Sequence, residues 1–219
     1  MTKLRSIGLS LILLAGAAGL IASSVADFNA QTTNASTFAS GTLVLSDAKT
    51  SGTTCLSTGG ATTDTNSNAT GCDDLIAATV QKPGGTASSA VVTLRQVGSI
   101  ATGTFHLFAS SACVSTNAGA ETYHGTGDLC AAVALTVHDD TNNRCYYPTQ
   151  AAGACTLTAA NTLATFSTAY PNDTTPLVLS TTSLSSGIAF TVQAQLNSTA
   201  TNTVQGRTAS ISFGWKIAQ

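Results

Sequence analysis

Hydrophobic and polar residues alternate along several stretches of this chain, which is the pattern of a β-strand with one buried face. The clearest alternation covers residues 188–196, and a second covers residues 211–217. Shorter alternations or apolar runs lie at residues 43–45, 91–94, 105–107, 133–137 and 177–179. No apolar stripe of helical period and comparable length competes after residue 26. The pattern predicts an all-β protein with eight or nine short antiparallel strands, arranged as a jelly-roll-like or immunoglobulin-like sandwich.

The stretches between these strands are rich in Ser, Thr, Asn and Gly, notably residues 50–71 and 115–127. Such stretches are typical of loops and turns. The roughly 190 residues from 27 to 219 suit one domain, because all-β sandwiches commonly reach about this size.

Composition agrees with an all-β domain and excludes several other classes of protein. Only 8% of the residues are charged, against about 25% in ordinary soluble domains, so a coiled coil lacks the Glu and Lys that it needs. The eight Lys and Arg residues are scattered, which excludes a basic nucleic-acid binder. A mean hydropathy of +0.23 and a formal charge of -2 argue against disorder driven by charge.

The first 26 residues have the features of a secretory signal peptide. Lys3 and Arg5 precede an apolar stretch over residues 7–21, and small residues at 24 and 26 predict cleavage between Ala26 and Asp27. The alternative is a membrane anchor, but the stretch is shorter than the roughly 20 apolar residues of a transmembrane helix. We therefore expect a mature chain that is secreted to the extracellular space or a cell-surface matrix, without a permanent membrane anchor.

All six cysteines follow the predicted signal peptide, and an even number in an exported chain predicts disulfides. Six cysteines allow fifteen pairings. We expect neighbours in the sequence to pair, each bond closing a polar loop: Cys55 with Cys72, Cys113 with Cys130, and Cys145 with Cys155. A zinc site is less favoured, because the chain has no C-x-x-C pair.

The sequence offers little catalytic chemistry. Glu121 is the only glutamate, which excludes an H-E-x-x-H zinc motif. With His124 and Asp128 it could supply metal ligands from one Gly-rich loop, although a solvated loop is the simpler interpretation. His106 and His138 fall on the polar faces of predicted strands, where an exposed imidazole needs no function. We therefore predict no catalytic residue, no metal site and no enzyme activity.

Residues 64–68 resemble the start of a calcium loop, with oxygen ligands at alternate positions. However, Ala69 and Leu75 occupy the positions of the required Gly and Glu. Four further carboxylates could help to bind calcium, and turns explain them equally well: Asp73, Asp74, Asp139 and Asp140. The glycosylation sequons at Asn34, Asn68, Asn172 and Asn197 follow from a chain crowded with Asn and Thr. No cofactor is therefore predicted, and calcium stays an open alternative.

Three stretches resemble a known family. Residues 38–45 (FASGTLVL), shortly after Asp27 and Phe28, resemble the N-x-F-x-A-G-T-L-D-L opening of the TasA/camelysin family. Residues 202–219 resemble the family's ending, which carries Q-G, F and W at matching positions, and residues 92–99 resemble its strand leading into an N-x-G-S turn. Val44 replaces the usual acidic residue, Gln96 replaces the usual Asn, and the six cysteines are not general in the family.

The resemblance implies a jelly-roll subunit of extracellular or biofilm-matrix fibres, freed by a SipW-type signal peptidase. In the family, the freed N-terminal segment is thought to complete the sheet of the next subunit. Carried to this chain, the assembly strand would include Asp27, Phe28, Phe38, Leu43 and Leu45. A frayed terminus is the alternative reading of residues 27–37.

Two other functions stay open. Some relatives are described as metallo-endopeptidases, but no motif here carries that activity. A carbohydrate-binding jelly roll would show exposed aromatic residues, whereas Trp215, the only tryptophan, alternates with core positions.

Overall fold

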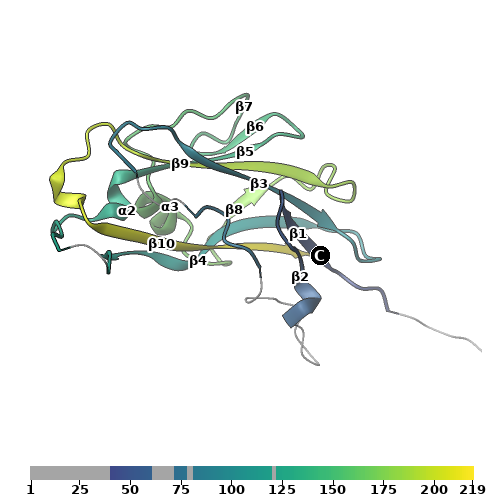
Figure 1. Cartoon of the computed structure of the whole chain (residues 1–219). Coiled ribbons are helices and arrows are strands. Elements are labelled where there is room, and N and C mark those ends of the chain that lie inside the picture. The colour runs from purple at the N-terminus through teal and green to yellow at the C-terminus, as the bar shows by residue number, and fades with distance from the viewer. Residues whose placement is uncertain (1–39, 61–71, 78–80, 120–121) are drawn as a thin grey trace, which may run out of the picture. The chain divides into compact units, whose positions relative to one another are not determined.

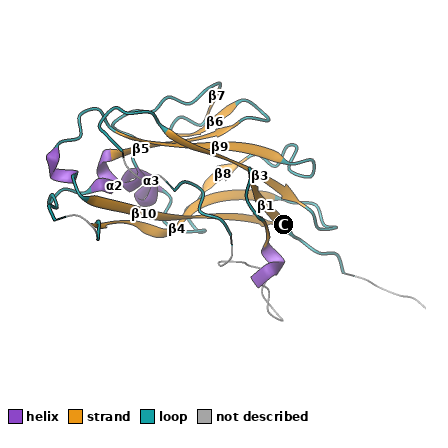
Figure 2. Cartoon of the chain, viewed as in Figure 1, coloured by secondary structure: helices purple, strands orange, loops and turns teal. Residues whose placement is uncertain are grey.

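The computed structural model describes residues 40–60, 72–77, 81–119 and 122–219. Residues Ser40–Gln219 belong to one compact unit, in which two antiparallel β-sheets pack face to face (Figures 1 and 2). The strands are β1 (Leu45–Lys49), β2 (Thr54–Leu56), β3 (Ser88–Gln96), β4 (Thr104–Asn117), β5 (Val133–Asp139), β6 (Arg144–Tyr147), β7 (Ala151–Ala152), β8 (Leu177–Leu179), β9 (Ile188–Leu196) and β10 (Arg207–Ala218). The helical elements are η1 (Ser57–Gly60), α2 (Leu129–Ala132), α3 (Leu163–Ala169) and η2 (Asn202–Val204).

The predicted antiparallel sandwich is confirmed, with its strands divided unequally between the sheets. One sheet has seven strands in the order β2-β1-β3-β9-β5-β6-β7, and the other has three in the order β10-β4-β8. The chain crosses between the sheets repeatedly, from β3 to β4, from β4 to β5 and from β9 to β10. Strands that are distant in sequence therefore become neighbours, as β3 and β5 do with β9.

Two predicted loops contain more regular structure than their composition suggests. The 50–71 stretch includes β2 and η1, and the 115–127 stretch begins inside β4, which is 14 residues long. β4 extends this far because β10 pairs with it over nearly its whole length, with a register shift near Ser111. The described residues therefore form ten strands rather than eight or nine. Pairing with a long partner outweighed the local preference of Ser and Thr for turns.

Aromatic side chains hold the two sheets together. Phe105 of β4 and Phe190 of β9 are fully buried, with ring centroids 6.0 Å apart in an edge-to-face arrangement. Trp215 of β10 lies 5.3 Å from Phe190, also measured between ring centroids. This cluster joins a central strand of the larger sheet to two strands of the smaller sheet. It confirms that Trp215 faces the core, as the alternation in residues 211–217 predicts.

The helix α3 was not predicted. It begins with a capping box, in which the side chains of Thr162 and Thr165 each accept a hydrogen bond from the other's backbone N–H. Leu163 and Phe166 are buried, and the Phe166 ring packs edge-to-face on Tyr147 at 5.2 Å. The helix has seven residues, which is fewer than two turns. It is therefore too short to show a repeated apolar stripe in the sequence.

The three disulfides pair cysteines that are neighbours in sequence, as predicted. Cys55 of β2 is bonded to Cys72, Cys113 of β4 to Cys130 of α2, and Cys145 of β6 to Cys155. Each bond connects a strand to a short helix or irregular segment beside it. A β-sandwich with three disulfides is consistent with an extracellular protein. In the part of the chain that the structure describes, no helix has the length and apolar character needed to cross a membrane.

The aromatic cluster predicts a large effect of truncating its central ring. Phe190→Ala should lower the free energy of unfolding by about 3–5 kcal/mol, because it removes a fully buried ring between the sheets. Val178→Ala is the matched control, since Val178 is 59% exposed on β8, and it should change stability by less than about 0.5 kcal/mol. Denaturant titration followed by Trp215 fluorescence measures both. Equal effects of the two substitutions would contradict the assignment of Phe190 to the centre of the core.

Candidate functional site

The main candidate site is a groove of about 790 Å³ that lies between the sheets along β10. We call it the β10 groove. The larger sheet contributes Val133, Leu135 and Leu196 to its lining, and β10 contributes Ala209, Ile211 and Phe213. Leu135 and Leu196 are buried, while the three β10 side chains are half-buried. The lining is therefore mainly apolar and partly open to solvent.

β10 forms an edge of the three-stranded sheet and is 12 residues long. Within the described ranges, it pairs with β4 on one side and with no strand on the other. The other terminal strands, β2, β7 and β8, have only three, two and three residues. Figure 2 shows β10 running along the margin of its sheet. It is therefore the longest sheet edge in the described structure that can accept a further strand.

Exposed edges are usually protected by short length, by charged residues or by proline. β10 lacks these features over its central part, because residues 208–215 carry neither a charge nor a proline. Its only charged residues, Arg207 and Lys216, stand near the two ends. An edge of this kind readily pairs with another extended chain.

The side chains of β10 alternate as the sequence predicts. Ala209, Ile211, Phe213, Trp215 and Ile217 pack against the core, whereas Thr208, Ser210 and Ser212 are exposed on the outer face. A strand that paired with this edge would therefore extend both the core-facing surface and the outer surface of the sheet. Its inward side chains would enter the β10 groove and its outward side chains would extend the hydroxyl-rich outer face.

The charges near the β10 groove lie at its rim. The Arg207 guanidinium donates hydrogen bonds to the Ser115 carbonyl at 2.9 Å and to the Asn117 side-chain oxygen at 2.6 Å. Both acceptors belong to β4, so this charge is held across the strand pair. Asp74 and Lys82 also line the groove and are exposed. The interior of the groove thus favours an uncharged segment with apolar side chains.

A third wall of the groove comes from outside the sheets. Leu75 and Ile76 are half-buried, pack against the core and line the groove. They belong to residues 72–77, which run across the open side of the sandwich between the two sheets (Figure 1). This segment is not a strand in the structure.

Of the predicted assembly residues, the structure describes two. Leu45 is the buried first residue of β1, and Leu43 is half-buried just before it. Asp27, Phe28 and Phe38 lie outside the described residues, as do Ala26 and the rest of the predicted signal peptide. The β10 groove itself was not predicted, because a sequence pattern does not show which strand ends at a sheet edge.

The candidate metal ligands between residues 121 and 128 that the structure describes have local structural partners. His124 Nδ1 lies 2.8 Å from the carbonyl oxygen of Gly206, and Asp128 caps α2 by accepting a hydrogen bond from the Cys130 N–H. Glu121 lies outside the described residues. Among the residues that are described, no three His, Cys, Asp or Glu side chains form a group that could hold a metal ion.

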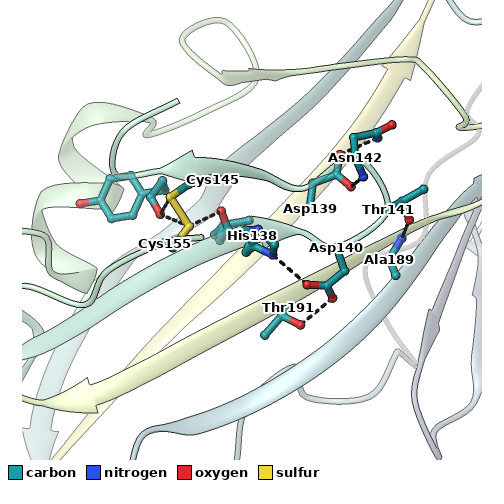
Figure 3. Close-up of polar contacts among 11 residues, drawn as sticks. His138, Asp139, Asp140, Thr141, Asn142, Cys145, Cys155, Ala189 and Thr191 are labelled. Atoms are coloured by element: carbon teal, nitrogen blue, oxygen red, sulfur yellow. Dashed lines mark hydrogen bonds and ion pairs between the residues drawn. A yellow bond between two sulfur atoms is a disulfide. The ribbon is translucent and has the colours of Figure 1, made fainter. Parts of the chain in front are cut away.

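The candidate calcium ligands also have other partners. Asp139 is buried and accepts two hydrogen bonds from Asn142, from its N–H at 2.9 Å and its side-chain amide at 2.8 Å (Figure 3). These bonds close the turn between β5 and β6. Asp73 accepts a hydrogen bond from the Thr53 N–H, and the Asp74 backbone carbonyl accepts one from Lys49. Residues 64–68 lie outside the described part of the chain.

The prediction that His106 and His138 are exposed is wrong, since both are half-buried. The His138 side chain is only 19% exposed, and its Nδ1 lies 2.8 Å from an Asp140 carboxylate oxygen (Figure 3). The other Asp140 oxygen accepts a hydrogen bond from the Thr191 hydroxyl at 2.6 Å. The cause is the segment around Cys155, which passes over this face of β5 and brings its sulfur within 3.3 Å of the Val137 carbonyl oxygen.

One carboxylate has a shifted pKa. Asp47 follows Leu45 on the core-facing side of β1 and stands opposite Leu94 of β3 and Cys55 of β2. Burial among these side chains disfavours the charged carboxylate and raises the pKa of Asp47 to about 6.

The described residues thus place a long strand edge, without a second strand partner, beside a groove lined in part by apolar side chains. A scan against protein-family models and a search of curated proteins find no match for this chain. The TasA/camelysin resemblance therefore rests on the sequence motifs alone.

Asp47 gives a prediction for the pH dependence of stability. Because its pKa is higher in the folded chain than the ordinary value of 3.8, the folded state loses stability as the pH rises from about 4 to above 6. Asp47→Asn should remove this loss and increase the free energy of unfolding at pH 7.5 by about 1–2 kcal/mol, allowing for residual contact with solvent.

Denaturant titrations at pH 4, 5.5 and 7.5 measure this effect. Asp173→Asn is the control, because Asp173 is an exposed carboxylate paired with Lys216 and should give no gain in stability at any of these pH values. A wild-type stability that does not fall between pH 4 and pH 7.5 relative to Asp47→Asn would contradict the prediction.

Proposed function

We propose that this chain is a secreted structural protein, a subunit of extracellular matrix or biofilm fibres or of a cell-surface layer. Subunits assemble by β-strand donation, in which an extended segment of one copy pairs with β10 of the next. The observation that carries this proposal is the long edge of β10, uncharged over residues 208–215, beside a groove lined mostly by apolar residues. The three disulfides support an extracellular setting.

The donor is the segment 28–39 of the neighbouring copy. It has 12 residues, the same number as β10, and it carries no charge. Phe28 and Phe38 are separated by an even number of positions, so in an extended strand they point to the same face. Both rings then enter the apolar groove, while Asp27 stays outside the paired segment. Signal-peptide cleavage before Asp27 frees this segment.

The chain direction favours donation to a neighbour over pairing within one chain. The Thr42 carbonyl accepts a hydrogen bond from Ile100, and Gly103 of the same loop donates to the carbonyl of Ala218, at the end of β10. Thr42 therefore lies at the end of the sandwich where β10 finishes. A subunit's own segment 28–39 would have to run parallel to β10, whereas every described strand pair is antiparallel. A second copy is free to add in the antiparallel direction, which is slightly more stable per residue.

A charge placed in the groove should block assembly. In Ala209→Lys the new side chain enters the β10 groove, and a donor strand would have to bury the ammonium group, so we expect no fibres. Ser212→Lys is the matched control, because Ser212 is exposed and does not line the groove, so assembly should continue. Electron microscopy of the mature chains, with circular dichroism to verify folding, measures the outcome. Fibres formed equally by both variants would show that the groove is not the acceptor.

Removal of the donor should also prevent elongation. Deleting residues 27–37 should leave a folded monomer, and the uncleaved precursor should not polymerise because its N-terminal segment is not free. Sedimentation velocity separates the monomer from assemblies in each sample. Fibres formed by the truncated chain as readily as by the mature chain would refute strand donation. Casein cleavage by the purified protein that is abolished by a chelator would instead support the endopeptidase alternative.

A further inference from the structure

The β10 groove already contains two apolar side chains from outside the sheets. Leu75 and Ile76 line it and pack against the core. Among the described residues, no backbone hydrogen bond joins residues 75–77 to either sheet. The burial of their side chains is therefore the main described interaction that holds these residues in the groove.

The contacts that anchor residues 72–77 lie at the beginning of this segment. Cys72 is bonded to Cys55 of β2, Asp73 accepts a hydrogen bond from Thr53, and the Asp74 carbonyl accepts one from Lys49. All three partners belong to the β1–β2 hairpin or its turn. The segment is thus fastened to a neighbouring hairpin at one end and enters the groove with the other.

We infer that residues 72–77 form a tethered plug that regulates access to the β10 groove. In the resting subunit, Leu75 and Ile76 occupy part of the apolar space beside β10, and they withdraw when a strand pairs with that edge. The Cys55–Cys72 disulfide keeps the plug close to the groove. The identity of the incoming strand rests on the proposed function, whereas the position of Leu75 and Ile76 in the groove does not depend on it.

The tether is the Cys55–Cys72 disulfide, which holds the plug near the groove by shortening the chain that connects it to the sheets. On its far side, the segment leads to Gly84, whose N–H donates to the Leu196 carbonyl of β9. With the disulfide, the plug lies on a connection of about 12 residues between Cys72 and Gly84; without it, the connection runs from Leu56 and has about 28 residues. The local concentration of the plug at the groove falls as the −3/2 power of this length, or about fourfold. Removing the two apolar side chains has a larger effect, because it abolishes the attraction itself.

The first experiment measures access to the groove in monomers of the mature chain from which residues 27–37, including most of the donor segment, have been deleted. Leu75→Ser with Ile76→Ser removes the plug and leaves the tether, whereas Cys55→Ser with Cys72→Ser removes the tether and leaves the plug. We expect the first pair to increase the binding of an apolar fluorescent dye about tenfold and the second to increase it about fourfold or less. Amide hydrogen exchange in residues 208–213 should become faster in the same order.

Two controls distinguish plug release from general loosening of the fold. Val178→Ser alters an exposed apolar residue that does not line the groove, and Cys145→Ser with Cys155→Ser removes a disulfide that is not linked to it. Both should leave dye binding and exchange in residues 208–213 unchanged. If the Leu75/Ile76 variant keeps its native circular dichroism and binds no more dye than the parent chain, the plug inference is wrong. If the cysteine variant fails to fold, the Leu75/Ile76 variant still decides the question.

The second experiment repeats these substitutions in the full mature chain and follows assembly by light scattering. Faster assembly of the plug variants supports the regulatory role. If the plug variants increase access to the groove in the monomer but no chain assembles, the plug is supported and the proposed function is refuted. If the parent chain assembles and the plug variants assemble at the same rate, the regulatory role of the plug is refuted and the proposed function stands.

Discussion

A three-stranded sheet cannot cover the inner face of a seven-stranded sheet, and the rest of this structure follows from that mismatch. The central strands of the larger sheet are covered by β4, β8 and β10, through the contacts of Phe105 and Trp215 with Phe190. Beyond these strands, apolar side chains of the larger sheet need other cover. The helix α3 supplies part of it with Leu163 and Phe166, and Leu75 and Ile76 supply another part without regular structure. The space that is left beside them is the β10 groove.

The same mismatch determines where the sheets end. The terminal strands of the larger sheet, β2 and β7, are very short, and each lies close to a disulfide, at Cys55 and at Cys145 respectively. β10 is long, and it has no charge in its middle. The described part of the chain thus combines short terminal strands with one long edge beside an apolar space. That contrast is the reason for assigning assembly to β10 rather than to the sandwich as a whole.

The scarcity of charge shapes the rest of the molecule. Among the described residues, Lys216 forms an exposed ion pair with Asp173, and the His138 ring contacts the Asp140 carboxylate. Hydroxyl and amide groups provide most of the other side-chain hydrogen bonds, as in the capping box of α3 and the turn closed by Asp139 and Asn142. In such surroundings a single half-buried carboxylate, Asp47, has few opposite charges to stabilise it, and its burial therefore governs its pKa.

The sequence by itself determined the all-β class and the inward faces of β9 and β10, and it correctly predicted the pairing of the cysteines. These features are local, because a period of two sets which side chains share a face, and disulfides between sequence neighbours need no knowledge of topology. The tertiary structure decided the features that depend on distant segments. It placed β10 at an edge, extended β4 through a stretch of Ser and Thr by pairing it with β10, and covered His138 with the segment around Cys155. A sequence pattern shows which face of a strand is apolar, but only the packing of distant segments decides whether that strand has a second neighbour.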